Sequence, residues 1–273
     1  MNKSDVIFEL QGMYYSYLGK FPALCGIDMR ITQGQKLAII GANGTGKSTL
    51  LRVLDGLIFP DRGSILAYGT ALTENLLSDE KLSRNFRTKV GFVFQNPDVQ
   101  LFCPTVKEDI VFGPLHLGFP QEEVSKRLEE VVMDFDLGDL LERSPHQLSI
   151  GEKRKVAIAS VLAIHPEVLL LDEPTAGLDP KTARHIIDII CRKNEEGKTI
   201  VTTTHDMHIV GEIADTICCL GREKRIARCG PAEELLADRV FLEENNLIHV
   251  HTHRHMDKTH IHSHDHLDHH THN

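Results

Sequence analysis

A glycine-rich stretch between an apolar run and a helical pattern constrains the fold more than any other feature. Residues 36–40 predict a buried strand, and the pattern over residues 49–54 predicts a helix. The spacing between them is G-x-x-x-x-G-K-[ST], the phosphate-binding P-loop that joins a strand to a helix. The residues of this loop are Gly41, Ala42, Asn43, Gly44, Thr45, Gly46, Lys47, Ser48 and Thr49.

The chemistry of this loop predicts a nucleotide site. Glycines let backbone N–H groups close around a polyphosphate without a Cβ in the way, and the helix N-terminus adds a positive dipole end. Lys47 is expected to reach the β- and γ-phosphates, and the Ser48 hydroxyl to bind Mg²⁺.

The composition limits the class of protein. The chain has 273 residues, 41% of them hydrophobic, and a formal net charge of −9, which argues against nucleic acid as the main partner. No apolar run is long enough to span a membrane, and residues 1–5 lack the apolar core of a signal peptide, so we expect a cytosolic chain. The cysteines form no C-x-x-C pair and are expected to be reduced thiols, with Cys218 and Cys219 on opposite faces of a strand.

Polar residues follow several predicted strands. The apolar run 168–171 predicts a central parallel strand, and it ends at Asp172 and Glu173. Asp172 is expected to hold Mg²⁺ through water, and Glu173 to act as the general base on the attacking water. Gln95 and His205 end two further predicted strands, so each can reach a metal, a phosphate or the water at the same sheet edge.

The middle of the chain is helical in pattern. Residues from 97 to about 160 form an apparent insertion into the α/β domain, with one helix predicted over 121–135. Ser149 and Gly151 stand at the start of another strong helix, where they make a second anion site.

Together, the order and spacing of these motifs resemble the ATP-binding subunit of ATP-binding-cassette (ABC) transporters over residues 5–235. The resemblance implies an α/β P-loop NTPase domain over residues 1–247, with an antiparallel β subdomain and an inserted helical subdomain. It assigns Gln95 to the Q-loop, residues 148–152 to the signature, Asp179 to the D-loop and His205 to the switch position. Tyr17, about 30 residues before Lys47, matches the aromatic residue that stacks on adenine, although Tyr14 and Tyr15 lie close by.

The resemblance also implies a head-to-tail dimer with two ATP molecules at its interface. Each ATP would lie between the P-loop of one subunit and Ser149 and Gly151 of the other, with Glu152 and Asp179 close to it. We therefore expect a homodimer, although a paralogue would serve as well. Ile150 and Glu152 depart from the usual Leu-Ser-Gly-Gly-Gln signature, and we expect them to tune the rate and not to abolish activity.

Residues 95–114 look like the corresponding segment of energy-coupling-factor (ECF) ATPases of the cobalt and nickel type. This likeness implies a transmembrane ECF subunit and a substrate-specific membrane component as partners, at the cytoplasmic face of the cell membrane. The apolar Leu101, Phe102, Val106 and Phe112 suit a partner groove, but they equally suit a core.

The C-terminal residues 248–273 alternate histidine with polar residues and hold most of the 17 histidines. Low hydrophobicity predicts a disordered tail, and neutral imidazoles bind nickel, cobalt, zinc or copper better as the pH rises above about 6.5. A tag or a merely solubilising tail is the alternative. The candidate ligands are His249, His251, His253, His255, His260, His262, His264, His266, His269, His270 and His272.

The predicted function is that of an ATPase subunit, with ATP and Mg²⁺, for an ECF-type importer of nickel or, next, cobalt. One alternative is a vitamin importer whose tail is incidental. Another is a soluble ABC ATPase that acts on DNA or ribosomes, and a third is a metal-storage protein or metallochaperone.

Overall fold

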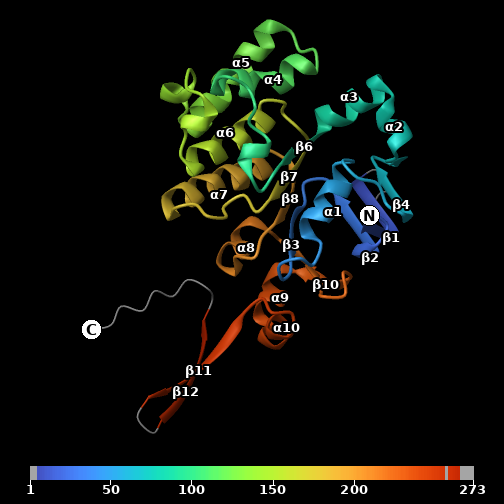
Figure 1. The fold of residues 1–273 in the computed structure, drawn as a ribbon, viewed down its shortest axis with the longest axis vertical. Coiled ribbons are helices and arrows are strands. Elements are labelled where there is room, and N and C mark those ends of the chain that lie inside the picture. The colour runs from blue at the N-terminus through green and yellow to red at the C-terminus, as the bar shows by residue number, and fades with distance from the viewer. Residues whose placement is uncertain (1–4, 256–257, 265–273) are drawn as a thin grey trace.

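The computed structural model describes residues 5–255 and 258–264, and two sheets form its framework (Figure 1). The larger sheet has the order β10-β9-β3-β8-β7-β6; the strands from β9 to β6 are parallel to one another, and β10 pairs antiparallel with β9. Its strands are β3 (Lys36–Ile40), β6 (Val90–Val93), β7 (Val168–Asp172), β8 (Thr199–Thr203), β9 (Thr216–Leu220) and β10 (Ile226–Pro231).

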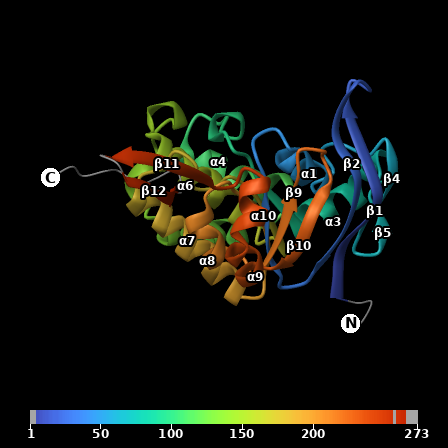
Figure 2. The same ribbon diagram turned by 90° about the horizontal axis from the view of Figure 1, so that it is seen from below.

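The smaller sheet is antiparallel and lies beside the larger one (Figure 2). Its order is β2-β1-β4-β5, and its strands are β1 (Val6–Tyr17), β2 (Phe21–Thr32), β4 (Arg62–Ala67) and β5 (Thr70–Ala71). The pairing of β1 with β2 continues across register shifts near Gly12 and Gly26, whose positive φ angles of 51° and 70° let each strand bulge and resume.

Helices fill the space around both sheets. They are α1 (Lys47–Leu54), α2 (Glu74–Ser78), α3 (Glu80–Lys89), α4 (Val106–His116), α5 (Gln121–Phe135), α6 (Ile150–Leu162), α7 (Pro180–Glu195), α8 (Met207–Ile213), α9 (Ala232–Ala237) and α10 (Arg239–Glu244), with short 3-10 turns at Pro97–Val99, Gly138–Leu140 and Pro145–Gln147. Helices α4, α5 and α6 lie between β6 and β7 in the chain and stand together at one end of the molecule (Figure 1). The predicted helix over 121–135 is confirmed as α5.

Alternation along β3 explains how one strand contributes to two of the three cores. Leu37 and Ile39 pack on the side of α1 and the antiparallel sheet, whereas Ala38 and Ile40 pack on the side of α8, α9 and α10. A third cluster joins the other face of β7 to α6 and α7. The buried sheet therefore fixes the loops that follow its strands, and these loops carry the predicted site. The predicted α/β class with an antiparallel sheet is confirmed.

The cysteine prediction was partly wrong. Cys218 and Cys219 do lie on opposite faces of β9, because they belong to different core clusters. However, Cys218 is joined to Cys229 in a disulfide. The register of β9 and β10 places the two residues directly opposite each other, and this pairing is not visible in the sequence spacing. Cys25, Cys103, Cys191 and Cys219 are free.

The described part of the histidine-rich tail has an extended backbone. Its backbone forms two antiparallel strands, β11 (His249–His255) and β12 (Lys258–His264). The register sets His249 opposite His264, His251 opposite His262 and His253 opposite His260. Valine, isoleucine and threonine alternate with these histidines, and β-branched residues favour strands. The candidate ligands His266, His269, His270 and His272 lie outside the described residues.

Candidate functional site

The P-loop wraps around the N-terminus of α1 as the sequence predicted. Gly46 caps the helix with a φ of 108°, and a Cβ there would lie 2.3 Å from the carbonyl oxygen of Ala23. Only glycine fits this position, because backbone atoms cannot move aside as a side chain can. The Lys47 ammonium donates hydrogen bonds to the carbonyl oxygens of Gly41 at 2.7 Å and Ala42 at 3.3 Å. Burial lowers the pKa of Lys47, while the nearby Glu173 and Asp172 act in the opposite direction.

A cavity of about 660 Å³ opens beside the P-loop. It is lined by Tyr17, Phe21, Pro22, Ala23, Asn43, Gly44, Gly46, Lys47, Ser48, Thr49, Gln95, Glu173, Ala176, His205 and Lys224. These residues come from the β1–β2 hairpin, the P-loop, the ends of three parallel strands and the β9–β10 turn. The cavity is thus built where ligands bind in parallel sheets, at the carboxyl ends of the strands.

Asp172 ends β7 and meets two hydroxyl groups. Its Oδ1 accepts a hydrogen bond from Ser48 Oγ at 3.0 Å and another from Thr203 Oγ1 at 2.6 Å. Hydroxyl and carboxylate oxygens are the ligands that Mg²⁺ prefers, so Ser48 and Asp172 fit the predicted magnesium site. Among the described side chains no group of three or more His, Cys, Asp and Glu residues is placed to hold a metal ion. The predicted magnesium ligands do not form such a group, because Asp172 is the only His, Cys, Asp or Glu residue among them.

Glu173 faces the cavity with a carboxylate that two other predicted residues contact. Glu173 Oε2 lies 3.1 Å from His205 Nδ1 and accepts a hydrogen bond from Gln95 Nε2 at 3.4 Å. The backbone of Glu173 has a φ of +46°, which turns the chain sharply after β7. Three residues from three strand ends thus meet at one carboxylate, which can accept a proton from a water molecule held beside it.

The aromatic wall of the cavity comes from the β1–β2 hairpin. Of the three neighbouring tyrosines, Tyr17 lines the cavity, and its hydroxyl contacts Thr49 Oγ1 at 3.1 Å and Arg52 at 3.3 Å. Tyr15 instead packs against the core, where burial raises its pKa. Phe21 pairs with Tyr17 across the hairpin and is 62% exposed. It is a second aromatic residue at this wall.

The signature residues do not line this cavity. Ser149 caps α6 in a capping box: its backbone N–H and its hydroxyl both donate to Glu152 Oε2 at 2.7 Å. These hydrogen bonds lower the pKa of Glu152. A Cβ on Gly151 would lie 3.3 Å from Thr182, whose backbone N–H donates to Asp179. The hydrogen bonds of Thr182 lower the pKa of Asp179. Ser149, Gly151, Glu152 and Asp179 therefore form a second cluster, at the starts of α6 and α7.

The exposed Ile150 is the first helical residue of α6, so the helix accommodates a bulky residue at the variant signature position. Glu152 is held by Ser149 through the capping box and does not lie unpaired beside the signature serine. Both departures from the usual motif thus have a defined local structure.

Sequence reasoning missed four residues around the cavity. Besides Phe21, the buried Arg154 of α6 donates to the carbonyl oxygens of Phe94 at 2.9 Å and Gln95 at 2.5 Å. Lys224 donates to the carbonyl oxygen of Gly44, and Thr203 contacts Asp172. No local pattern marks Arg154, Lys224 and Thr203, because each of them acts on a segment that is distant in the sequence.

Within residues 5–255 and 258–264, no helix combines the length and the apolar character that a membrane span requires.

Comparison with known proteins identifies similar chains. Residues 24–176 match the family described as ABC transporter. The "Nickel import ATP-binding protein NikO" of Rhodobacter capsulatus is 48% identical over 244 residues, which cover 88% of this chain and 95% of NikO. The "Energy-coupling factor transporter ATP-binding protein EcfA" of Methanothermobacter thermautotrophicus is 44% identical over 227 residues, covering 83% of this chain and 72% of that protein.

Solved structures give the same fold. The structure of cbiO1 from Clostridium perfringens, part of the ABC transporter complex cbiONQ, has a TM-score of 0.75 and 36% identity, and the match covers 89% of this chain and 95% of cbiO1. The ATP-binding cassette MJ0796, solved as a dimer in a post-hydrolysis state with ADP and Pi, has a TM-score of 0.74 and 30% identity, with 83% of this chain and 99% of that one covered.

Proposed function

We propose that this chain, which belongs to the ABC transporter family of ATP-binding subunits, hydrolyses ATP to power the import of a transition-metal cation. Nickel is the first candidate ion and cobalt the second. The observation that carries the catalytic part is the meeting of Glu173, His205 and Gln95 beside Lys47 in one cavity. The choice of ion is supported by the 48% identity to a protein named for nickel import.

Each residue of the cavity has a part in the proposed reaction. Lys47 and the backbone N–H groups of the P-loop hold the β- and γ-phosphates, and Tyr17 stacks on the adenine. Ser48 and Gln95, with Asp172 through water, would hold Mg²⁺, which supplies charge neutralisation at the phosphates when bound. Glu173 takes a proton from the attacking water, and His205 orients that water or the γ-phosphate.

The second cluster completes the site from another copy of the chain. Ser149, Gly151, Glu152 and Asp179 cannot serve the cavity of their own chain, since none of them lines it. A head-to-tail homodimer would bring them to the partner's ATP, and the dimeric form of the similar cassette MJ0796 supports this arrangement.

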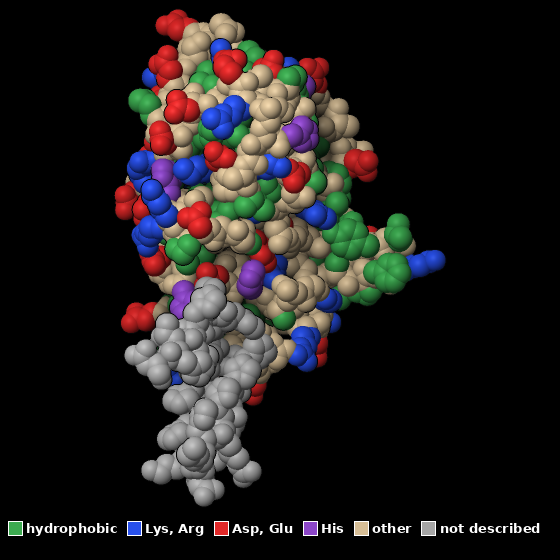
Figure 3. Space-filling model, turned by 60° about the vertical axis from the view of Figure 1, so that its left-hand side comes forward, with side chains coloured by type: hydrophobic (Ala, Val, Ile, Leu, Met, Phe, Trp, Pro, Cys, Tyr) green, Lys and Arg blue, Asp and Glu red, His purple; other side chains and the backbone are tan. Residues whose placement is uncertain are grey.

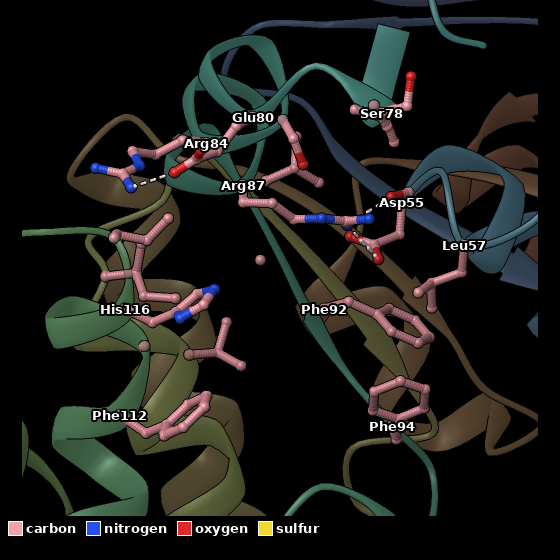
Figure 4. A pocket seen from close by; sticks show the side chains of 18 residues that line it. Asp55, Leu57, Ser78, Glu80, Arg84, Arg87, Phe92, Phe94, Phe112 and His116 are labelled. Atoms are coloured by element: carbon pink, nitrogen blue, oxygen red, sulfur yellow. Dashed lines mark hydrogen bonds and ion pairs between the residues drawn. The ribbon is translucent and has the colours of Figure 1, made fainter. Parts of the chain in front are cut away.

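A groove between α3 and α4 suits the membrane partner (Figure 4). Its volume is about 740 Å³, and β6 forms its floor with Phe92. Phe112 projects from α4 and is 45% exposed, while Phe102 packs against it edge-on with ring centroids 4.9 Å apart. The sequence left four apolar residues open between a core and a groove. Leu101 and Val106 are buried in the core, and Phe102 and Phe112 remain available to a partner.

The wall of the groove opposite α4 holds a buried ion pair. Arg87 of α3 donates to Asp55 Oδ2 at 2.8 Å and to the Asp55 carbonyl oxygen at 2.7 Å (Figure 4). Burial raises the pKa of Asp55 to about 7, although Arg87 opposes this shift. The pair connects α3 to the end of α1. The groove is therefore in contact with the helix that carries Lys47 and Ser48.

Phe112→Asp tests the groove. We expect this variant to lose its association with the membrane fraction, because a charge at the apolar wall opposes burial against a partner. The ATPase activity of the purified chain should stay within about 2-fold of wild type, since Phe112 is remote from the cavity. The matched control is Met133→Asp on α5, where a 75% exposed apolar residue lies outside the groove. Membrane binding that is equal in both variants would refute docking here.

The transported ion is tested by cellular metal content. Elemental mass spectrometry would compare cells that carry the wild-type gene with cells that carry Glu173→Gln, both grown at trace metal. A selective fall in nickel or cobalt in the variant is the expected result. Unchanged metals together with reduced vitamin uptake would favour the vitamin importer instead.

A soluble role on nucleic acid has little support. The net charge is −9, and acidic and basic side chains are interspersed over the face shown in Figure 3. A phosphate-binding surface requires clustered lysine and arginine. We therefore propose no nucleic-acid partner. With membrane subunits as its partners, the chain would lie peripherally at the cytoplasmic face of the membrane.

The histidine-rich tail is proposed to buffer or store the imported metal. Seven of its candidate ligands lie on the paired strands β11 and β12, at positions that alternate with other residues. Imidazole binds nickel, cobalt and zinc. If the whole protein instead serves to store metal, added metal should change its ATPase rate little. The ATPase rate with and without metal therefore distinguishes a metal-storage protein from an importer subunit.

Removal of residues 249–273 tests this role. The truncation keeps Leu247 and Ile248, because both are buried against α8 and its neighbours. We expect the shortened chain to lose most Ni²⁺ binding in isothermal titration at about pH 7.5, where imidazoles are neutral, and to keep its ATPase activity. Equal Ni²⁺ binding by the two chains would rule the tail out as the metal site.

A further inference from the structure

Thr203 joins the two acidic residues at the end of β7, Asp172 and Glu173, through one buried hydroxyl group. It is the last residue of β8, and the register of β7 and β8 sets it opposite Asp172. Its Oγ1 donates to Asp172 Oδ1 at 2.6 Å and accepts a hydrogen bond from the backbone N–H of Glu173 at 3.0 Å. A hydroxyl has one hydrogen and two lone pairs, so both hydrogen bonds form at once.

We propose that Thr203 is a positioning residue for ATP hydrolysis, which fixes Asp172 and Glu173 relative to each other. The inference rests on the proposed ATPase function and extends it to a residue in the interior of the sheet. Thr203 is fully buried and does not line the cavity, so it acts through the two acids and not on the nucleotide.

The backbone at Glu173 shows what Thr203 holds in place. Its φ of +46° is a conformation that residues other than glycine rarely adopt. The N–H of Glu173 is held by Thr203 at two acceptors, the hydroxyl at 3.0 Å and the main-chain carbonyl oxygen at 3.1 Å. This sharp turn directs the carboxylate of Glu173 to His205 and Gln95. Without the hydroxyl, one of the two bonds that hold the turn is lost.

The carboxylate of Asp172 depends on the same hydroxyl. Asp172 Oδ1 accepts one hydrogen bond from Ser48 Oγ on the P-loop side and another from Thr203 Oγ1 on the sheet side. The threonine bond is the shorter of the two and comes from a buried strand, whereas Ser48 is also the predicted Mg²⁺ ligand. Thr203 would therefore keep Asp172 oriented if Ser48 also binds Mg²⁺.

The neighbouring Thr202 provides a matched control. It is equally buried on the same strand, but its hydroxyl faces the main-chain carbonyl oxygens of Leu171 at 3.3 Å and Thr203 at 3.4 Å. Thr202→Val and Thr203→Val remove the same group from the same strand. Only the second change removes a contact to the acidic residues.

The experiment measures kcat, KM for ATP, the Mg²⁺ dependence of nucleotide binding and the melting temperature for full-length variants. Thr203→Val keeps the shape of the side chain, and we expect its kcat to fall about 10- to 100-fold, the rate equivalent of one hydrogen bond to a charged group. Its KM for ATP should change less than about 3-fold, whereas the Mg²⁺ concentration for half-maximal nucleotide binding should rise. Thr203→Ser should restore kcat to within about 3-fold of wild type, because serine keeps the hydroxyl.

Three outcomes would overturn the inference: a Thr203→Val enzyme within about 2-fold of wild-type kcat and Mg²⁺ dependence, a Thr202→Val enzyme as slow as Thr203→Val, or a Thr203→Ser enzyme that is not rescued. If Thr203→Val does not fold, Thr203→Cys replaces it, since its thiol is a weak donor of similar size and should give an intermediate rate. A wild-type chain that hydrolyses no ATP would instead refute the proposed function, and the Mg²⁺ dependence of nucleotide binding would still test Thr203.

Discussion

Glu173→Gln should lower the rate of ATP hydrolysis by about 100-fold or more while leaving ATP binding nearly unchanged. A general base contributes about 10²- to 10⁴-fold to a rate, and an amide cannot accept the proton that the carboxylate accepts. Glutamine has the shape of glutamate, so the cavity, with Lys47 and Ser48 in its lining, should persist. Phosphate release would be measured at steady state, and nucleotide binding by fluorescence titration.

The control for this variant is Glu167→Gln. Glu167 stands just before β7, at the opposite end of the strand from Glu173, and pairs with Lys89 at the surface. We expect this variant to hydrolyse ATP at nearly the wild-type rate. A Glu173→Gln rate within about 3-fold of wild type would remove Glu173 from the role of base.

Gly46→Ala should abolish ATP binding and destabilise the fold by about 3 kcal/mol or more. The new Cβ would lie 2.3 Å from the Ala23 carbonyl oxygen, and the φ of 108° is strained for any residue with a side chain. A strained backbone conformation costs about 1 to 3 kcal/mol, and overpacking adds a similar amount. Chemical denaturation would give the free energy of unfolding, and titration the affinity for ATP.

Gly44→Ala separates the cost of backbone strain from the cost of a steric clash in the same loop. Gly44 has a φ of 77°, but a Cβ there meets no atom within 4 Å. The expected loss of stability is therefore about 1 kcal/mol, from the backbone alone. Equal losses for Gly44→Ala and Gly46→Ala would mean that the contact between the P-loop and Ala23 does not constrain the loop.

Most residues of the candidate site could be predicted because each of them stands at a place that local rules mark. Gln95, Asp172 and His205 follow predicted strands, and parallel strands bring their carboxyl ends to one edge. The P-loop is marked by its glycine spacing. The strand order itself could not be read from the sequence, yet any parallel order among these strands puts the same residues on the same edge.

The residues that sequence reasoning missed depend on contacts between distant segments. Thr203 belongs to a run of threonines in which nothing distinguishes it from Thr202, and only the pairing of β7 with β8 brings it to Asp172. Arg154 looks like a surface residue of a helix but is buried against the segment of Gln95. Lys224 lies in a turn 180 residues after Gly44, and it reaches the P-loop by a hydrogen bond to the Gly44 carbonyl oxygen.

The same limit applies to strand pairing elsewhere in the chain. Strands β1 and β2 continue beyond their glycine bulges because each is the pairing partner of the other. The link between Cys218 and Cys229 and the pairing of β11 with β12 both depend on strand register. Alternation predicts which residues share a face of a strand, but register is set by the partner strand and the turn between them.

The decisive experiment is ATP-dependent uptake of radioactive nickel into right-side-out vesicles of the native membrane, loaded with ATP. We expect vesicles containing the wild-type chain to accumulate nickel, and vesicles containing Glu173→Gln at the same level not to do so. Unlabelled cobalt should compete better than zinc if the importer takes both of its candidate ions. Equal nickel accumulation with the wild-type and Glu173→Gln chains would show that ATP hydrolysis by this chain does not drive nickel import.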